Sequence, residues 1–298
     1  METKKKPMLH QSHLQTLWRC GMKFKKVVIE GRREPLRTPL VIGCATHAAN
    51  AKNLQHKIDT GALFNREEMQ DTARDSFMKE WESFPLVMDE EEKALGLNKV
   101  KGIAQDHTIQ LSTIYHYAVA SQVIPKSVER SWVLKMKAFP FDLAGTWDVD
   151  EDYFTEGKRI ISIRDTKTKK INSGQVEVDR SDQYTVYAMA KKFIDGVLPN
   201  QIWQDNLLRP TKTRPAVSVS YPSTRTVQDF KTFYNRFEIA NKIIEKECYA
   251  PANPTDYWCS KEFCGFAASG ECPYFNSNRI SSRADLKKLI KPTRVIIK

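Results

Sequence analysis

The chain has 298 residues, of which 41% are apolar and 10% aromatic, so it can bury one large core or two modest ones. No apolar run comes near the roughly 20 residues that cross a bilayer, and we expect no membrane partner. The formal net charge of +11 and the pI near 9.3 favour polyanionic partners such as nucleic acid. A ribosome-associated or membrane-surface protein would show the same charge balance.

The first residues are basic but lack the apolar core of a secretory signal. We therefore expect a cytoplasmic protein, the cytoplasm of an infected host cell included. In that reducing compartment the six cysteines are better explained as metal ligands or free thiols than as disulfides.

The first part of the chain has the apolar spacing of helices, which we expect over 12–20, 40–58, 65–84 and 104–122. Gly43 permits close packing of the second of these. The third has the clearest start, because Asn65 and Glu68 fit a capping box. The acidic run 89–92 is predicted to be a solvated loop.

The pattern then changes to the alternation of apolar and polar residues that is typical of strands. Strands are predicted over 131–139, 143–150 and 159–167, with turn-forming residues around Gly157 between the last two. A helix should open at Ser181 or Asp182, followed by a loop over 209–225 and a helix over 227–247. Helices, a compact sheet and further helices predict an α/β core with a helical elaboration.

Two of these strands carry acids where they end. Asp148 closes one strand, and Asp165 and Lys167 share a face of the next because strand side chains alternate. Paired strand ends can bring the two carboxylates together, as Mg²⁺ or Mn²⁺ requires. The lysine could then stabilise charge on a scissile phosphate or orient the attacking water. The alternative is two surface acids and a surface lysine, since Asp-x-Lys triplets recur in this chain.

Further motifs lie in a fixed order around these strands: G-x-x-x-H at Gly43–His47, Glu129 before the sheet, G-x-x-D at Gly145–Asp148, D-x-K-T at Asp165–Thr168 and Q-x-x-x-Y at Gln183–Tyr187. The order resembles that of RecB-type nucleases of the PD-(D/E)xK superfamily, which include lambda-exonuclease-like and CRISPR-adaptation nucleases. The resemblance covers residues 12 to 275. It implies a restriction-endonuclease-like fold, in which helices flank a small central mixed β-sheet.

The same resemblance implies roles for individual residues. Metal ligands would be His47, Asp148, Asp165 and the backbone carbonyl of Thr166. Glu129 would be a further acid near the metal and Lys167 the catalytic lysine, while Gln183 and Tyr187 would contact substrate or order the site. Asp150, Glu151 and Asp152 are predicted to be solvated loop acids, although Asp150 is a rival to Asp148 as ligand.

Three cysteines, Cys259, Cys264 and Cys272, lie close together near the C-terminus and with a fourth would suit a zinc or iron–sulfur site. The resemblance implies a [4Fe–4S] cluster whose fourth ligand is the early Cys20. The spacing departs from the C-x-x-C common in the family, which leaves Zn²⁺ open, and Cys248 competes as the fourth ligand. Cys44 is predicted to be buried and inert.

Together these features predict a single nuclease domain over 1–298: a helical elaboration (48–124), a catalytic sheet and helix (125–198), and a cysteine-rich segment (248–275) that closes onto the N-terminus near Cys20. The expected activity is Mg²⁺- or Mn²⁺-dependent DNA cleavage at single-stranded or duplex ends. An exonuclease of phage or mobile-element recombination or replication fits best.

Two other functions stay open. One is a non-catalytic nucleic-acid-binding protein with a structural Cys₄ site, and the other is a CRISPR-adaptation nuclease. The sequence contains no P-loop motif, so unwinding would need a separate helicase or recombinase partner.

Overall fold

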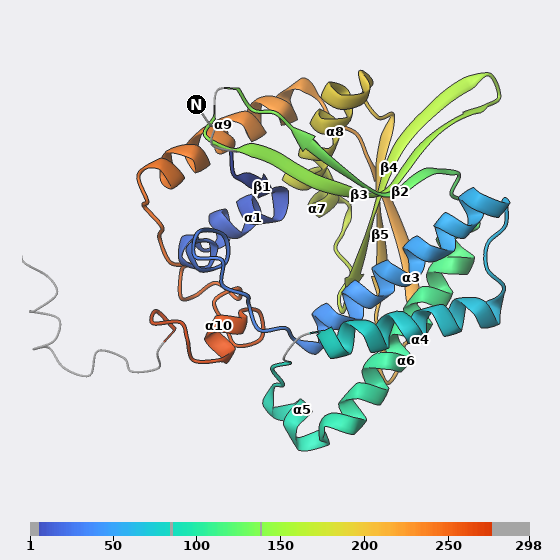
Figure 1. The fold of residues 1–298 in the computed structure, drawn as a ribbon, viewed down its shortest axis with the longest axis horizontal. Coiled ribbons are helices and arrows are strands. Elements are labelled where there is room, and N and C mark those ends of the chain that lie inside the picture. Colours follow the sequence, from blue (N-terminus) through green and yellow to red (C-terminus); the bar gives the residue numbers. More distant parts are fainter. Residues whose placement is uncertain (1–5, 84–85, 138, 276–298) are drawn as a thin grey trace, which may run out of the picture.

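The computed structural model describes residues 6–83, 86–137 and 139–275. Its centre is a six-stranded mixed sheet in the order β1-β3-β4-β5-β6, with β2 paired to β3 outside this path (Figure 1). The β1–β3 and β4–β5 pairs are parallel and the others antiparallel. The strands are β1 (Met8–His10), β2 (Pro125–Leu134), β3 (Asp142–Thr155), β4 (Lys158–Lys169), β5 (Gln201–Leu208) and β6 (Val217–Ser223).

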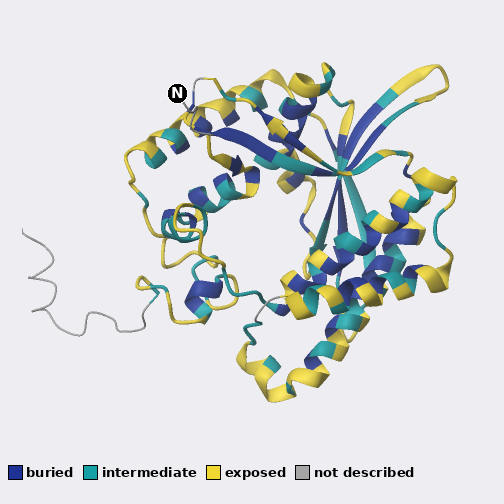
Figure 2. Cartoon of the chain, in the orientation of Figure 1, coloured by how far each residue is buried: buried dark blue, intermediate teal, exposed yellow. Residues whose placement is uncertain are grey.

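Helices cover both faces of this sheet (Figures 1 and 2). One hydrophobic core lies between the sheet and α3 (Thr38–Thr60), α4 (Arg66–Ser83) and α6 (Leu97–Tyr115). The other lies against α1 (Gln11–Arg19), α8 (Asp182–Asp195) and α9 (Val227–Glu245). The shorter helical elements are α2 (Gly21–Phe24), α5 (Glu90–Leu95), α7 (Gln175–Asp179), α10 (Gly265–Ala268) and two π-helical turns, Lys25–Ile29 and His116–Ala120. No helix in the described part of the chain is long and apolar enough to cross a membrane.

Two predicted helix starts are confirmed, those of α4 and α8, while α1 begins one residue before the expected 12. Asn65 accepts the backbone N–H of Glu68, and the Glu68 carboxylate accepts that of Asn65, which closes the capping box before α4. Ser181 is the N-cap of α8. The acidic run is not a loop, because Asp89 and Glu92 form another capping box and start α5, although the acids there stay largely exposed.

The sheet forks at β3, and this feature positions the site. One edge of β3 pairs with β1 over residues 142–144 and with β4 over 149–155, so the segment Gly145–Asp148 pairs with neither. Its other edge continues along β2. A Cβ on Gly145 would lie 2.3 Å from the Trp132 ring, which explains why this segment begins with glycine. The fork leaves room beside Asp148 that a continuous sheet would close.

Beyond the fork, β3 and β4 continue as a hairpin that projects from the sheet (Figure 1), and its turn at Glu156–Gly157 has positive φ at both residues. The acids expected in a loop after Asp148 are therefore strand residues. Asp150 and Glu151 are buried at 0% and 3% exposure, and Asp152 is paired with Lys126 and Arg159. The polar run misled the sequence prediction because each acid has a specific partner.

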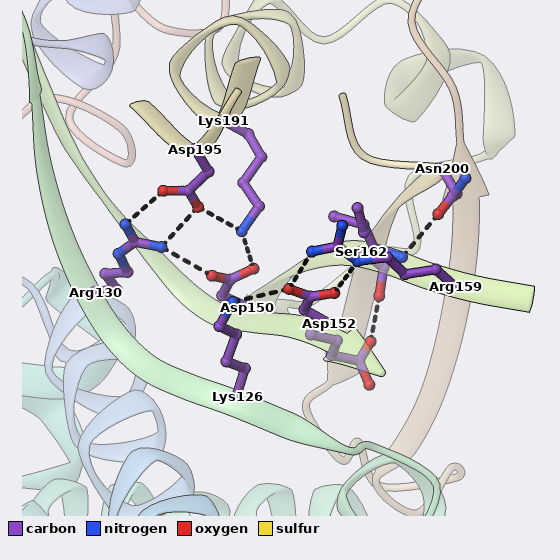
Figure 3. A network of polar contacts seen from close by, with 11 residues as sticks. Lys126, Arg130, Asp150, Asp152, Arg159, Ser162, Lys191, Asp195 and Asn200 are labelled. Atoms are coloured by element: carbon purple, nitrogen blue, oxygen red, sulfur yellow. Dashed lines mark hydrogen bonds and ion pairs between the residues drawn. The ribbon is translucent and has the colours of Figure 1, made fainter. Parts of the chain in front are cut away.

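Asp150 belongs to a buried ion-pair network between the sheet and α8 (Figure 3). Lys191, itself 1% exposed, contacts Asp150 at 2.5 Å and Asp195 at 2.8 Å. Arg130 donates to both oxygens of Asp195 and lies 3.2 Å from Asp150. The carboxylate of Asp150, the predicted rival to Asp148, is therefore paired with Lys191 and Arg130.

Several boundaries differ from the prediction. The sheet extends past 198, since β5 was missed and β6 lies in the expected loop 209–225. The first predicted strand begins earlier, at Pro125, and ends at Leu134, because the chain turns away after it; position 138 lies outside the described residues. Cys44 is exposed rather than buried.

Candidate functional site

Asp148 occupies the mouth of the fork. Its Oδ2 accepts the backbone N–H of Thr166 at 2.8 Å, so a carboxylate replaces the strand carbonyl that this N–H would otherwise meet. The same oxygen lies 3.3 Å from Nδ1 of His47. Burial alone would raise the pKa of Asp148, but His47 and Lys167 outweigh it and lower the pKa, so the carboxylate stays charged.

His47 reaches Asp148 from α3, on the opposite side of the fork from α8. The helix can approach the sheet because Gly43 has no side chain: a Cβ there would lie 3.0 Å from Oγ1 of Thr168. His47 is one turn further along. Burial by itself would lower the pKa of His47, but the neighbouring Asp148 carboxylate raises it. The imidazole is therefore held by a carboxylate, a common arrangement for a metal-binding histidine.

Glu129 completes a cluster with these two residues. It lies inside β2 rather than before it, and its neighbours Val128 and Arg130 pair with Val149 and Trp147. Its φ of 48° places a non-glycine residue in the left-handed region, an energetically costly conformation that often marks a functional site. Burial, with a contribution from Asp148, raises the pKa of Glu129 to about 7.

One ligand atom from each of His47, Glu129 and Asp148 lies within 4.8 Å of the others, and all three line a cavity of about 10 Å³. Two carboxylates and an imidazole at this separation match the donor set of a divalent cation.

Asp165 is not one of this group, and its side chain turns towards α8. Oδ1 accepts from Gln183 at 3.0 Å and Tyr187 at 3.3 Å, while Oδ2 lies 3.0 Å from the Tyr184 hydroxyl. Burial, then the charge of Asp148, raises the pKa of Asp165 against the opposing effect of Lys167. The helix thus fixes the orientation of this acid.

Tyr184 was missed by the sequence analysis. Its hydroxyl lies 3.0 Å from Oδ2 of Asp165 and 2.5 Å from Oε1 of Gln204, on β5. Its position next to Gln183 could have indicated it, but the Q-x-x-x-Y spacing pointed to Tyr187 as the tyrosine of the site. Tyr184 is fully buried, and it acts on the site through its contact with the Asp165 carboxylate.

Lys167 shares the face of Asp165, as strand alternation predicted. Its Nζ lies 2.8 Å from Oδ2 of Asp165, and its side chain remains 33% exposed. Burial would lower the pKa of Lys167, but Asp165 and Asp148 raise it, so the lysine keeps its charge. Thr166, which lies between Asp165 and Lys167 in the sequence, is 3% exposed, and its backbone N–H donates to Asp148.

The cysteine-rich segment packs against the N-terminal segment. Arg19 stacks over the Trp258 ring at 3.7 Å, and the N–H of Gly265 donates to Glu34 at 2.7 Å. Burial raises the pKa of Cys259, and the thiols of Cys272, Cys20 and Cys264 raise it further. The Cys259 thiol therefore lies within electrostatic reach of the other three. Cys248 is exposed, and its thiol donates to a local carbonyl, that of Lys246, at 3.3 Å.

Fold and cluster together define a class: an α/β protein with a candidate hard-cation site, and a charged lysine nearby, where a mixed sheet forks. Residues 9–273 match the family described as the PD-(D/E)XK nuclease superfamily, and the chain belongs to that superfamily. Its members are nucleases that usually use divalent metals, and the cluster of His47, Glu129 and Asp148 has the donor types that such ions bind.

Comparison with curated proteins finds no match. Among solved structures, the chain is similar to the one titled "Crystal structure of SSO0001", with a TM-score of 0.32 and 10% identity over 90% of this chain and 97% of that chain.

Proposed function

We propose that the protein is a Mg²⁺- or Mn²⁺-dependent DNA exonuclease that acts on single-stranded or duplex ends. The observation that carries the proposal is the convergence of His47, Glu129 and Asp148 at the fork. Lys167 is close enough to lower the pKa of both His47 and Asp148. A non-catalytic DNA-binding protein would have no need of this cluster or of the strained backbone at Glu129.

In this proposal His47, Asp148 and Glu129 would hold the cation, and Asp165 and the Thr166 carbonyl would be the further ligands that the family resemblance implies. The bound ion supplies Lewis-acid activation of water and of the scissile phosphate. Lys167 stabilises the charge that develops on the phosphoryl oxygens. Water adds to phosphorus and loses a proton to solvent, the bond to the leaving oxygen breaks, and the departing oxygen takes a proton from solvent.

Residues on α8 orient the acid that faces Lys167. Gln183, Tyr184 and Tyr187 restrict Asp165 to one rotamer, so its charge and that of Lys167 stay paired until substrate binds. Such preorganisation lowers the cost of reaching the reactive geometry. The net charge of +11 would attract DNA and raise its association rate.

The test is digestion of end-labelled linear DNA and of closed circular DNA with Mg²⁺, with Mn²⁺ and with EDTA. An exonuclease degrades the linear DNA in a metal-dependent way and leaves the circle intact. Binding without cleavage under every condition would favour a non-catalytic DNA-binding protein. Cleavage of the circle would make the protein an endonuclease.

We further propose that Cys20, Cys259, Cys264 and Cys272 hold a [4Fe–4S] cluster that joins the two ends of the fold. The influence of the Cys20, Cys264 and Cys272 thiols on the pKa of Cys259 supports this ligand set, and the exposed Cys248, whose thiol donates to the Lys246 carbonyl, favours Cys20 as the fourth member. Protein purified without oxygen should be brown and contain iron, and Cys259→Ser should lose both properties while Cys248→Ser keeps them. Colourless protein with one equivalent of zinc would replace the cluster with a zinc site.

A biological role in phage or mobile-element recombination or replication, with a separate helicase or recombinase as partner, agrees with the lack of a P-loop in the sequence. Co-purification of an ATP-dependent motor from the native host would support that role.

A further inference from the structure

Asn50 is a buried polar side chain with no hydrogen-bond partner among the described protein atoms. It is 4% exposed, and neither its amide oxygen nor its amide nitrogen is bonded. Burying an amide without partners removes its hydrogen bonds to water and puts none in their place, which destabilises the folded state. An unpaired buried group in a native protein therefore calls for an explanation, such as a bound water or ion.

The amide lies at the candidate cation site. Asn50 follows His47 by three residues on α3, so the two side chains share a helical face. Asn50 also lines the small cavity whose walls include His47, Glu129 and Asp148. That cavity, about 10 Å³, is close to the size of one water molecule or small ion.

Asn53, on the same helix, shows what a structural asparagine looks like here. It is fully buried, but its amide nitrogen lies 3.1 Å from His116, and its oxygen accepts the backbone N–H of Phe64 at 3.0 Å. Both of its polar ends are used by the protein. Those of Asn50 have no partner among the described residues, and the side chain lines the cavity that His47, Glu129 and Asp148 also line.

We propose that Asn50 is a positioning residue for the cation: its amide oxygen accepts a hydrogen bond from a water molecule of the ion's hydration shell. The inference rests on the proposed divalent-cation site and extends it beyond the three clustered ligands. Mg²⁺ keeps several of its waters in proteins, and groups that hold such waters fix the orientation of the shell. Asn50 thereby sets where the bound water molecules point relative to Lys167 and the substrate.

The test is Mn²⁺ binding to the full chain by titration calorimetry, together with thermal unfolding of the metal-free protein. Asn50→Leu should weaken Mn²⁺ binding by about 10–100-fold, the usual effect of losing an outer contact. Without metal its melting temperature should stay the same or rise, because the variant removes two unpaired buried groups. Asn53→Leu is the matched control, which should lower the melting temperature and leave the affinity of its folded fraction unchanged.

Asn50→Leu with wild-type affinity would overturn the proposal. Should that variant not fold, Asn50→Asp decides, because an added carboxylate beside the cation should tighten Mn²⁺ binding; unchanged or weaker binding would count against Asn50. Glu129→Gly separates the two claims, because it removes a carboxylate of the cluster at a φ that glycine accepts. If Glu129→Gly weakens or abolishes binding and Asn50→Leu does not, only the role of Asn50 fails. If the wild type binds no Mn²⁺, or Glu129→Gly binds as well as wild type, the cation site itself fails and the inference with it.

Discussion

The carboxylate of Asp148 accepts the backbone N–H of Thr166 at 2.8 Å, although the strands that carry the two residues no longer pair at this point. The side chain therefore does two things: it satisfies a strand N–H at the fork and it faces the imidazole of His47. Removing it would alter the sheet as well as the site, so Asp148 variants report on both. Lys167 and Glu129 offer cleaner tests.

Lys167→Ala should reduce the rate of DNA cleavage by about 10²–10³-fold, the usual effect of removing one group that stabilises transition-state charge. DNA binding should change little, since one lysine contributes a small part of the net charge of +11. Single-turnover cleavage and a filter-binding assay measure the two effects. Lys169→Ala is the control on the same strand, because Lys169 pairs with Glu177 rather than with Asp165. Equal losses in both variants would contradict a special role for Lys167.

Glu129→Gly should separate stability from activity. Glycine accepts a φ of 48° without strain, so the unfolding free energy should rise by ~1 kcal/mol or stay unchanged, while cleavage falls because the cluster loses a carboxylate. Urea denaturation measures the unfolding free energy, and a cleavage assay measures the activity. The control is Glu156→Gly at the hairpin turn, where φ is 47°: this variant should gain similar stability and keep full activity. An active Glu129→Gly protein would remove Glu129 from the site.

Lys191→Met should destabilise the fold by about 3–5 kcal/mol, because breaking a buried ion pair leaves Asp150 with less compensation for its lost hydration. Lys126→Met, at the half-exposed pair with Asp152, should cost less than about 1 kcal/mol. Urea denaturation of both variants gives the comparison. Similar small losses would show that Arg130 alone suffices for Asp150.

The Asp195 carboxylate should make stability depend on acid pH. Hydrogen bonds from Arg130, opposed by burial and aided by Lys191, lower its pKa from 3.8 to about 2. A depressed carboxylate pKa stabilises the fold above the unfolded value and loses that contribution as pH falls through the folded one. Asp195→Asn should therefore be less stable than wild type at pH 7, with a difference that narrows between about pH 4 and pH 2. A difference independent of pH would show that geometry, not charge, holds the network.

Local chemistry explains which elements could be predicted. The capping residues Asn65 and Glu68 and the alternation over Ile161–Lys167 act between near neighbours in the chain, so α4 and most of β4 were expected correctly. The strands β5 and β6 were not. Strand β6 is half-buried and forms by pairing with β5. In β5 the polar residues are buried by distant partners: Asp205, at 0% exposure, is paired with Arg164. The same reason turned the expected loop acids after Asp148 into strand residues.

By itself, the sequence determined the residue types of the site and their order: a histidine after Gly43, two acids and a lysine on strands, and a glutamine and tyrosine on one helical face. Only the tertiary structure decided which of them meet. It joined His47 and Asp148 to Glu129, turned Asp165 towards Tyr184 and paired Asp150 with Lys191. It also left the Asn50 amide, beside the cluster, without a hydrogen-bond partner among the described residues. The physical reason is the fork at Gly145–Asp148: strand pairing is a long-range property, and where it stops decides which side chains have room to converge.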